Sequence, residues 1–252
     1  MQELALARGA GGGFVAGVGR GALTALRALG DVRTWAPHLA QQMRRLGVDS
    51  VPIAIFIAVF TGIVLALLSN YIFTGAVPLY LVGALVGKTV TMELAPVLTG
   101  MALAGRVGAN IAAELGTMRV TEQVDALETL AYDANAYLVV PRVLAATLMF
   151  PVVTAFAMAI GICSGWVAAI GILDLTALQF KKGLLLFYEF KDIWFGLLKS
   201  ASFGFAVALM GSLQGLASGG GAQGVGAAAT RAVVLGCEAI LMLDAFWAVV
   251  LL

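Results

Sequence analysis

Long uncharged runs alternate with short charged stretches along this chain. Residues 50–87, 143–173 and 200–230 contain no Asp, Glu, Lys, Arg or His. Each run exceeds the roughly 20 residues that an α-helix needs to cross the hydrocarbon core of a bilayer. The pattern therefore predicts an all-α membrane protein that crosses the bilayer several times.

The hydrophobic runs and the turn-forming residues between them predict five transmembrane helices. Their expected ranges are 51–73, 79–113, 143–172, 193–217 and 233–252. The second range is too long for a straight, perpendicular span and contains Lys88, Glu93 and Pro96. This helix must therefore tilt, kink or line a polar cavity. The Gly-rich residues 218–226 are expected to form a loop before the fifth span.

Two further segments are expected to lie at the bilayer surface. Residues 20–46 form a basic amphipathic pattern, and residues 174–192 mix lysines with Phe and Tyr. Both patterns are typical of interfacial helices. The lone His38 falls in the first segment and is expected to be solvated there. We therefore divide the chain into a leader with an interfacial amphipathic helix, residues 1–47, and a transmembrane domain, residues 48–252.

Composition and charge agree with a membrane protein. Of the 252 residues, 61% are hydrophobic and 12% are charged, whereas soluble domains have about 25% charged residues. The net charge of +1 gives no reason to expect a nucleic-acid partner. With the N-terminus in the cytoplasm, ten of the fifteen basic residues lie inside, and Lys181, Lys182, Lys191 and Lys199 lie outside. The positive-inside rule thus predicts a cytoplasmic N-terminus and, after five crossings, a periplasmic C-terminus.

Few residues could carry enzymatic chemistry. With one histidine near the N-terminus, no Ser-His-Asp or Cys-His arrangement is possible, and no carboxylate cluster suggests a metal site. The string GALVGKT at 83–89 has three residues between its glycines, whereas a phosphate-binding loop needs four, and it lies in a span. Cys163 and Cys237 lie in apolar runs and are interpreted as packing residues. We expect a transport subunit that binds no cofactor of its own.

Glu93 lies well inside the second span. An intramembrane carboxylate is costly enough to indicate a functional site. Two structural explanations compete with that hypothesis: an ion pair with Lys88 or Arg106, or a hydrogen bond near a helix break at Pro96. The sequence leaves these alternatives open.

The charged string ELGTMRVTEQVDALETLAYD at 114–133 separates the second and third spans and carries six charged side chains. On a helical wheel, one face holds the apolar residues Val120, Val124, Leu127 and Ala131. The acidic residues Glu122, Asp125 and Glu128 occupy the opposite face. Such a helix is either an interfacial linker or a docking surface for a soluble partner.

Two long strings resemble the MlaE/YrbE family of ABC transporter permeases. The first is ELAPVLTGMALAGRVGANIAAELGTMRVTEQVDALETLAYD, followed by PRVLA, and the second is the run at 196–234 that contains SGGGAQGVGAAATRAVV. The resemblance covers about residues 35–252, with departures at Ala95, Ala228 and Ala229. It implies a homodimer in the inner membrane, two ATPase subunits that bind ATP and Mg, and an MCE-domain protein on the periplasmic side. The implied cargo is lipid, usually phospholipid, moving between the inner and outer membranes.

The resemblance also implies roles for particular residues. Residues 114–131 would be the coupling helix, with Val120, Val124 and Leu127 packed against the membrane domain. The side chains expected to face the ATPase are Glu114, Arg119, Glu122, Asp125 and Glu128. Because a buried acid is costly, Glu93 is also predicted to face a cavity at the dimer interface, and its candidate lipid-facing neighbours are Leu67, Leu68, Tyr71 and Tyr80. The alternative is a secondary transporter or channel that uses Glu93 as a proton or ion site, against which stands the lack of a second intramembrane acid in an obvious inverted repeat.

Overall fold

The computed structural model describes residues 32–73, 77–130, 132–173 and 175–251. All the regular structure in these ranges is helical. The α-helices are α3 (Val32–Leu46), α4 (Val51–Ile72), α5 (Leu81–Thr89), α6 (Ala95–Leu103), α7 (Ala109–Val120), α8 (Gln123–Thr129), α9 (Val140–Ile172), α10 (Ala177–Phe187), α11 (Phe190–Leu216) and α12 (Gly221–Leu251). Of the predicted amphipathic segment, residues 20–31 lie outside the described ranges.

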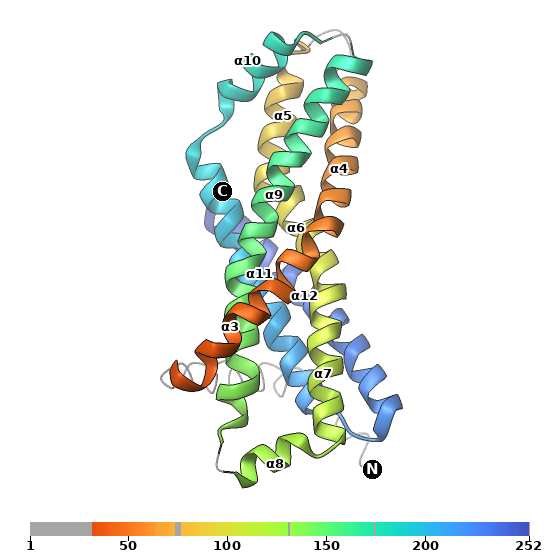
Figure 1. Ribbon diagram of the computed structural model, residues 1–252. Coiled ribbons are helices and arrows are strands. Elements are labelled where there is room, and N and C mark those ends of the chain that lie inside the picture. The colour runs from red at the N-terminus through yellow and green to blue at the C-terminus, as the bar shows by residue number, and fades with distance from the viewer. Residues whose placement is uncertain (1–31, 74–76, 131, 174, 252) are drawn as a thin grey trace.

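Five helical stretches in the described ranges are long and apolar enough to cross a bilayer. They are Trp35–Ile72, Leu81–Val120, Asn135–Ile172, Phe190–Leu216 and Gly221–Val250. The prediction of an all-α membrane protein with five spans is therefore confirmed. Figure 1 shows an elongated bundle, with α8 at one end and α10 at the other.

The predicted loop at 218–226 is wrong in its extent. α12 already begins at Gly221, so only residues 217–220 separate it from α11. Gly220 and Gly221 adopt positive φ angles of 80° and 72°, which glycine does without steric cost and which turn the chain. The alanines that follow are the strongest helix formers, and they outweigh the glycines at 224 and 226.

The second span is one helical stretch with two wider, π-helical turns. These turns are η2 (Val90–Leu94) and η3 (Ala104–Gly108), and a third, η4 (Asn135–Val139), precedes α9. Insertions of this kind in an α-helix occur often at functional sites. At 40 residues, the span is about 60 Å long at ~1.5 Å per residue. It therefore reaches beyond a bilayer core of about 30 Å.

Small residues allow the spans to pack closely. α9 lies at the centre, packed against α4, α11 and α3, while α11 also packs against α12 and α7. A Cβ added at Gly62 of α4 would overlap the carbonyl oxygen of Gly161 on α9, so only glycine fits there. Without a hydrophobic driving force between helices in lipid, such close backbone contact is a main source of association.

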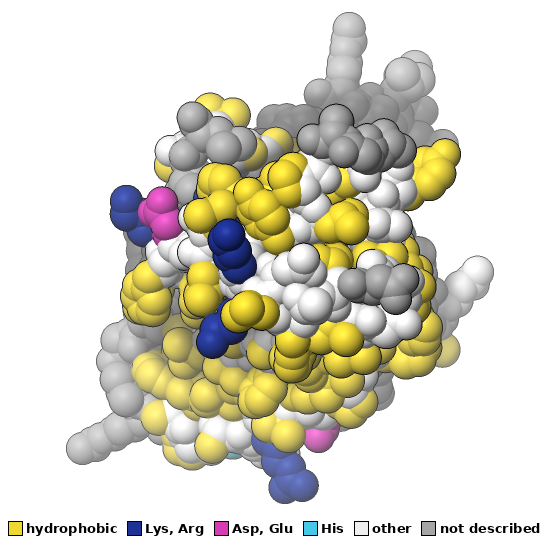
Figure 2. All heavy atoms as spheres, turned by 90° about the horizontal axis from the view of Figure 1, so that it is seen from above, with side chains coloured by type: hydrophobic (Ala, Val, Ile, Leu, Met, Phe, Trp, Pro, Cys, Tyr) yellow, Lys and Arg dark blue, Asp and Glu magenta, His cyan; other side chains and the backbone are white. Residues whose placement is uncertain are grey.

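The end of the bundle that carries α10 is largely apolar. α10 forms inside the predicted segment 174–192 and begins with a capping box between Thr176 and Gln179. Leu178, Leu185 and Phe187 on this helix are all more than half exposed. Seen from this end, hydrophobic side chains cover much of the described surface, and only a few charged side chains are visible among them (Figure 2). This mixture agrees with a helix at the bilayer surface.

Candidate functional site

A cluster of three charged side chains lies inside the bundle, and we call it the charge triad: Glu93, Lys199 and Asp244. The ammonium nitrogen of Lys199 lies 2.6 Å from Oε2 of Glu93 and also forms an ion pair with Oδ1 of Asp244. The Lys199 side chain is fully buried, whereas the side chains of Glu93 and Asp244 are 47% and 19% exposed. The triad thus joins the second, fourth and fifth spans and has one more carboxylate than it has cations.

Local backbone features bring Lys199 to the second span. Glu93 lies in the π-helical turn η2, and Pro96 cannot donate a backbone hydrogen bond to the carbonyl of Met92. The Lys199 ammonium donates to that carbonyl oxygen at 3.5 Å. One turn earlier on α11, a Cβ at Gly196 would overlap the carbonyl oxygen of Thr91. Glycine therefore lets α11 approach η2 closely enough for the ion pair to form.

Polar contacts around the triad hold α11 to its neighbours. The hydroxyls of Thr154 on α9 and Ser200 on α11 lie 2.7 Å apart and share a hydrogen bond. The indole N–H of Trp247 on α12 donates to the hydroxyl of Ser202 at 3.0 Å. Buried polar groups in a bilayer need such partners, because no water is available to them. These hydrogen bonds therefore fix α11, which carries Lys199, against α9 and α12.

Both ion-pair partners suggested for Glu93 by the sequence are wrong. Lys88 lies 3.7 Å from Asp192, and Arg106 donates to the hydroxyl of Ser50. The actual partner is Lys199, which is buried within α11 and is therefore not one of the outer lysines expected from the sequence. Three of the lysines expected on the outer side, Lys181, Lys182 and Lys191, remain in that group.

Asp244 is a functional candidate that the sequence reasoning missed. It lies inside the predicted fifth span. A carboxylate in such an apolar run could have been recognised as a candidate from the sequence. Glu238, also on α12, is a further intramembrane acid, and its side chain is exposed. The argument against an ion site is the lack of a second intramembrane acid in an obvious inverted repeat, and these two residues weaken it.

The predicted lipid-facing residues are not brought to the triad. Leu68 and Tyr71 are exposed at the end of α4, while Leu67 beside them is half-buried. Tyr80 is also half-buried, and the ammonium of Lys182 lies 5.4 Å from its ring centroid. Tyr80 precedes Glu93 by 13 residues, which is about 20 Å of helix at ~1.5 Å per residue. These residues belong to the end of the bundle that carries α10.

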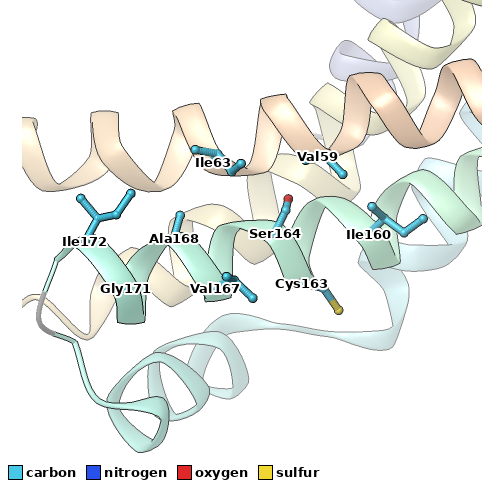
Figure 3. A pocket seen from close by; sticks show the side chains of 9 residues that line it. All are labelled: Val59, Ile63, Ile160, Cys163, Ser164, Val167, Ala168, Gly171 and Ile172. Atoms are coloured by element: carbon cyan, nitrogen blue, oxygen red, sulfur yellow. The ribbon is translucent and has the colours of Figure 1, made fainter.

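An apolar groove runs between α4 and α9 on the side of the bundle toward α10 (Figure 3). Its volume is about 570 Å³. The residues that line it are Val59, Ile63, Ile160, Cys163, Ser164, Val167, Ala168, Gly171 and Ile172. The hydroxyl of Ser164, its main polar group, donates to the carbonyl of Gly161 in the same helix. The groove therefore offers a hydrocarbon surface with little hydrogen-bonding capacity.

The predicted coupling helix is two helical segments, not one. α7 ends at Val120, Glu122 adopts a left-handed backbone with φ of 60°, and α8 begins at Gln123. The break turns the chain from the long axis of the span to a course across the end of the bundle (Figure 1). Of the apolar face, Val124 is buried and Leu127 half-buried, as predicted, but Val120 is 36% exposed and lies before the break.

The charged residues of this region separate into two groups. Glu122, Asp125 and Glu128 are exposed on and beside α8, and Arg119 forms an ion pair of 2.5 Å with Asp125. These four side chains lie at the surface of the described chain. Helix α8 therefore presents an acidic outer face.

Glu114 does not belong to that face. Its carboxylate lies 3.3 Å from the guanidinium of Arg142 and also pairs with Arg45. Arg142 is 5% exposed and donates to the carbonyl of Leu138 at 2.6 Å. Glu114 thus links α3, α7 and α9, and this corrects the expectation that it points toward a partner.

Within the described residues, no three His, Cys, Asp or Glu side chains gather closely enough to hold a metal ion.

The profile of the family described as Permease MlaE matches residues 39–250. A probable ABC transporter permease protein of Synechocystis is 40% identical over 208 residues, 82% of this chain and 78% of its own. A similarly named protein of Rickettsia prowazekii is 41% identical over 196 residues, covering 78% of this chain and 76% of its own. The chloroplastic protein TRIGALACTOSYLDIACYLGLYCEROL 1 of Arabidopsis thaliana is 31% identical over 204 residues, 81% of this chain and 58% of its own.

Proposed function

The chain belongs to the MlaE permease family and is a permease subunit of an ABC transporter; on that premise, we propose that it moves phospholipid or a related lipid between the inner and outer membranes. The choice of cargo is based on one observation. A half-exposed carboxylate, Glu93, lies in the second span, and a separate groove between α4 and α9 is almost entirely apolar. A path with one polar position and long hydrocarbon surfaces suits an amphipathic molecule. The Arabidopsis relative, which is named after a galactolipid, supports the same class of cargo.

Glu93 is the member of the triad that can engage cargo. Lys199 is fully buried and already shared by two carboxylates, so it has no accessible surface to offer. Nearly half of the Glu93 side chain is accessible, and its carboxylate has acceptor capacity beyond its bond to Lys199. In the proposed cycle, Glu93 accepts a hydrogen bond from the polar part of the lipid, while the acyl chains lie on apolar surfaces such as the groove between α4 and α9.

The proposed assembly is a homodimer with two ATPase subunits and an MCE-domain protein on the periplasmic side. Two spans support a second copy: the most apolar parts of the first and fifth spans are only 22% and 17% buried, against 50–61% for the other three spans. Both helices expose large apolar side chains, among them Phe56, Phe60 and Phe246. The acidic outer face of α8 is the proposed ATPase contact, and ATP and Mg are bound by the ATPase.

We further propose that this permease lies in the inner membrane with its N-terminus in the cytoplasm and its C-terminus in the periplasm. With the buried Lys199 and Arg142 left out, nine basic residues lie on the cytoplasmic side in this orientation and three on the other. The orientation places α8 on the side where ATP is available. A secondary transporter that uses Glu93 as an ion site is not retained, because the chain is an ABC permease.

The function is tested by purifying the chain with its native partners and identifying bound lipid by mass spectrometry. The same complex, reconstituted in vesicles, is then assayed for ATP-dependent transfer of a fluorescent phospholipid to acceptor vesicles. A non-hydrolysable ATP analogue provides the control. We expect transfer only with ATP. A complex that hydrolyses ATP but neither retains nor transfers lipid would refute the proposed cargo.

A further inference from the structure

A small socket lies between α8 and the base of the second and third spans, and we call it the α8 socket. Its volume is about 340 Å³. The residues that line it are Met118, Gln123, Val124, Ala126, Leu127, Leu130, Tyr137 and Leu138. Ligand pockets usually have volumes of ~300–1,000 Å³, so this one is large enough for one or two side chains but small for a whole lipid.

The walls of the socket come from three different elements. Met118 belongs to α7, Ala126 and Leu127 to α8, and Leu138 to η4. Tyr137 forms part of the wall, and its ring meets that of His38 on α3 edge-on, with centroids 4.7 Å apart. His38, predicted to be solvated, is in fact half-buried against this ring. A group seated in the socket would therefore contact the coupling region and the third span at once.

The chemistry of the socket and its surroundings defines the occupant. Most of the lining is apolar, and Leu130 is 69% exposed although it lines the socket. The outer face of the same helix carries the exposed acids Glu122, Asp125 and Glu128. An apolar seat beside an acidic surface complements an apolar side chain flanked by Lys or Arg, and it repels anionic lipid headgroups.

We propose that the α8 socket receives one bulky apolar side chain of the ATPase subunit, with basic residues on either side of it. This proposal rests on the proposed function, in which α8 contacts the ATPase. It adds an anchoring side chain through which movement of the ATPase can be transmitted to the spans. Exposed ion pairs hold long, mobile side chains together weakly. A desolvated anchor at the centre of a contact typically dominates its affinity.

The anchor explains how motion passes from the ATPase to the spans. α8 has only seven residues, and irregular backbone flanks it on both sides. A partner bound to the outer face of α8 alone could rotate this helix without moving the bundle. A side chain seated in the socket presses on Met118 and Leu138 as well, so displacement of the ATPase displaces α7 and the start of the third span.

The test measures binding of the cognate ATPase to purified full-length permease variants. In the key variant, a larger side chain at a lining position fills the socket. Ala126→Trp places an indole in the socket, and Thr129→Trp, one turn away on α8 but outside the lining, is the matched control. We expect Ala126→Trp to weaken binding at least ten-fold and Thr129→Trp to change it less than two-fold. Equal binding by both variants would overturn the proposal.

A second measurement covers the case in which Ala126→Trp does not fold. Ala126→Cys and Thr129→Cys are made with Cys163 and Cys237 replaced by serine, and their reaction with a water-soluble maleimide is followed. The ATPase should slow labelling at position 126 at least ten-fold. If labelling at 126 is already slow without ATPase and is restored by removing residues 1–31, the occupant is this chain's own leader and the proposal is wrong.

A different pattern of results would contradict the proposed contact between α8 and the ATPase. The triple reversal of Glu122, Asp125 and Glu128 to Lys removes the acidic face but leaves the lining intact. If this variant loses the ATPase while Ala126→Trp binds it normally, α8 is the contact but the socket is not its anchor. If neither variant loses the ATPase, α8 is not the contact at all.

Discussion

Removing the cation from the charge triad should destabilise the protein far more than removing one of its anions. Lys199→Met leaves Glu93 and Asp244 facing each other without a shared partner. Breaking a buried ion pair by deleting one partner typically costs about 3–5 kcal/mol, because the remaining charge stays buried. Glu93 is 47% exposed, so most of this cost should come from Asp244, which is 19% exposed.

The expected loss can be expressed as a melting temperature. At ~2–4 °C per kcal/mol for chains of this size, about 3–5 kcal/mol corresponds to roughly 6–20 °C. The assay is thermal unfolding of the purified permease in detergent. Lys199→Met with Asp244→Asn should recover most of the stability, because only the half-exposed Glu93 then stays unpaired.

Glu93→Gln separates function from structure in the same triad. Lys199 keeps Asp244 as its partner in this variant, so the melting temperature should fall by much less than in Lys199→Met. Lipid transfer in reconstituted vesicles should nevertheless fall strongly, because the carboxylate on the proposed lipid path is gone. A Glu93→Gln or Glu93→Ala variant that transfers lipid at the normal rate would make the residue structural. A Lys199→Met variant as stable as the wild type would refute the reasoning about the buried charges.

Three other outcomes are expected. Glu114→Gln should lower stability by about 3 kcal/mol, as for a broken buried pair, because Arg142 is left buried without its anion. Arg45 lies at the more exposed side of the same cluster. Arg45→Ala should therefore lower stability by less than ~1 kcal/mol. Comparable melting temperatures for the two variants would contradict this. Gly62→Leu should separate α4 from α9 and reduce the yield of folded protein, whereas Gly171→Leu, where a Cβ meets nothing within 4 Å, should be tolerated. A tag at the N-terminus should be inaccessible from outside the cell and one at the C-terminus accessible; two cytoplasmic ends would rule out this topology.

The sequence determined the class of the fold and its five spans. A run of about 20 apolar residues in a bilayer has to form a helix, because every backbone N–H and C=O must find a partner inside the segment. That constraint is local, so it can be derived from hydrophobicity alone. The family could also be predicted, since its strings at 93–133 and 196–234 lie contiguously in the chain. Glu93 stood out for the same local reason, as a carboxylate in an apolar run.

The tertiary structure decided which charges meet. Lys199 follows Glu93 by 106 residues, and nothing in the local pattern of α11 says whether its ammonium points inward or reaches the bilayer surface. The pairing depends on how closely two helices approach, which Gly196 and the wide turn at η2 set together. Glu114 was misassigned for the same reason: its two arginine partners come from α3 and α9.

The ends of helices were also decided by the whole fold. The break at Glu122 has a left-handed backbone at a residue that would rarely adopt it in isolation, and it persists because the buried Val124 fixes α8 against the bundle. The start of α12 at Gly221 depends on two glycines with positive φ and on packing against α7 and α11. Hydrophobicity along a chain determines which segments enter the bilayer, whereas ion pairs, sockets and turns depend on which surfaces the packed helices bring together.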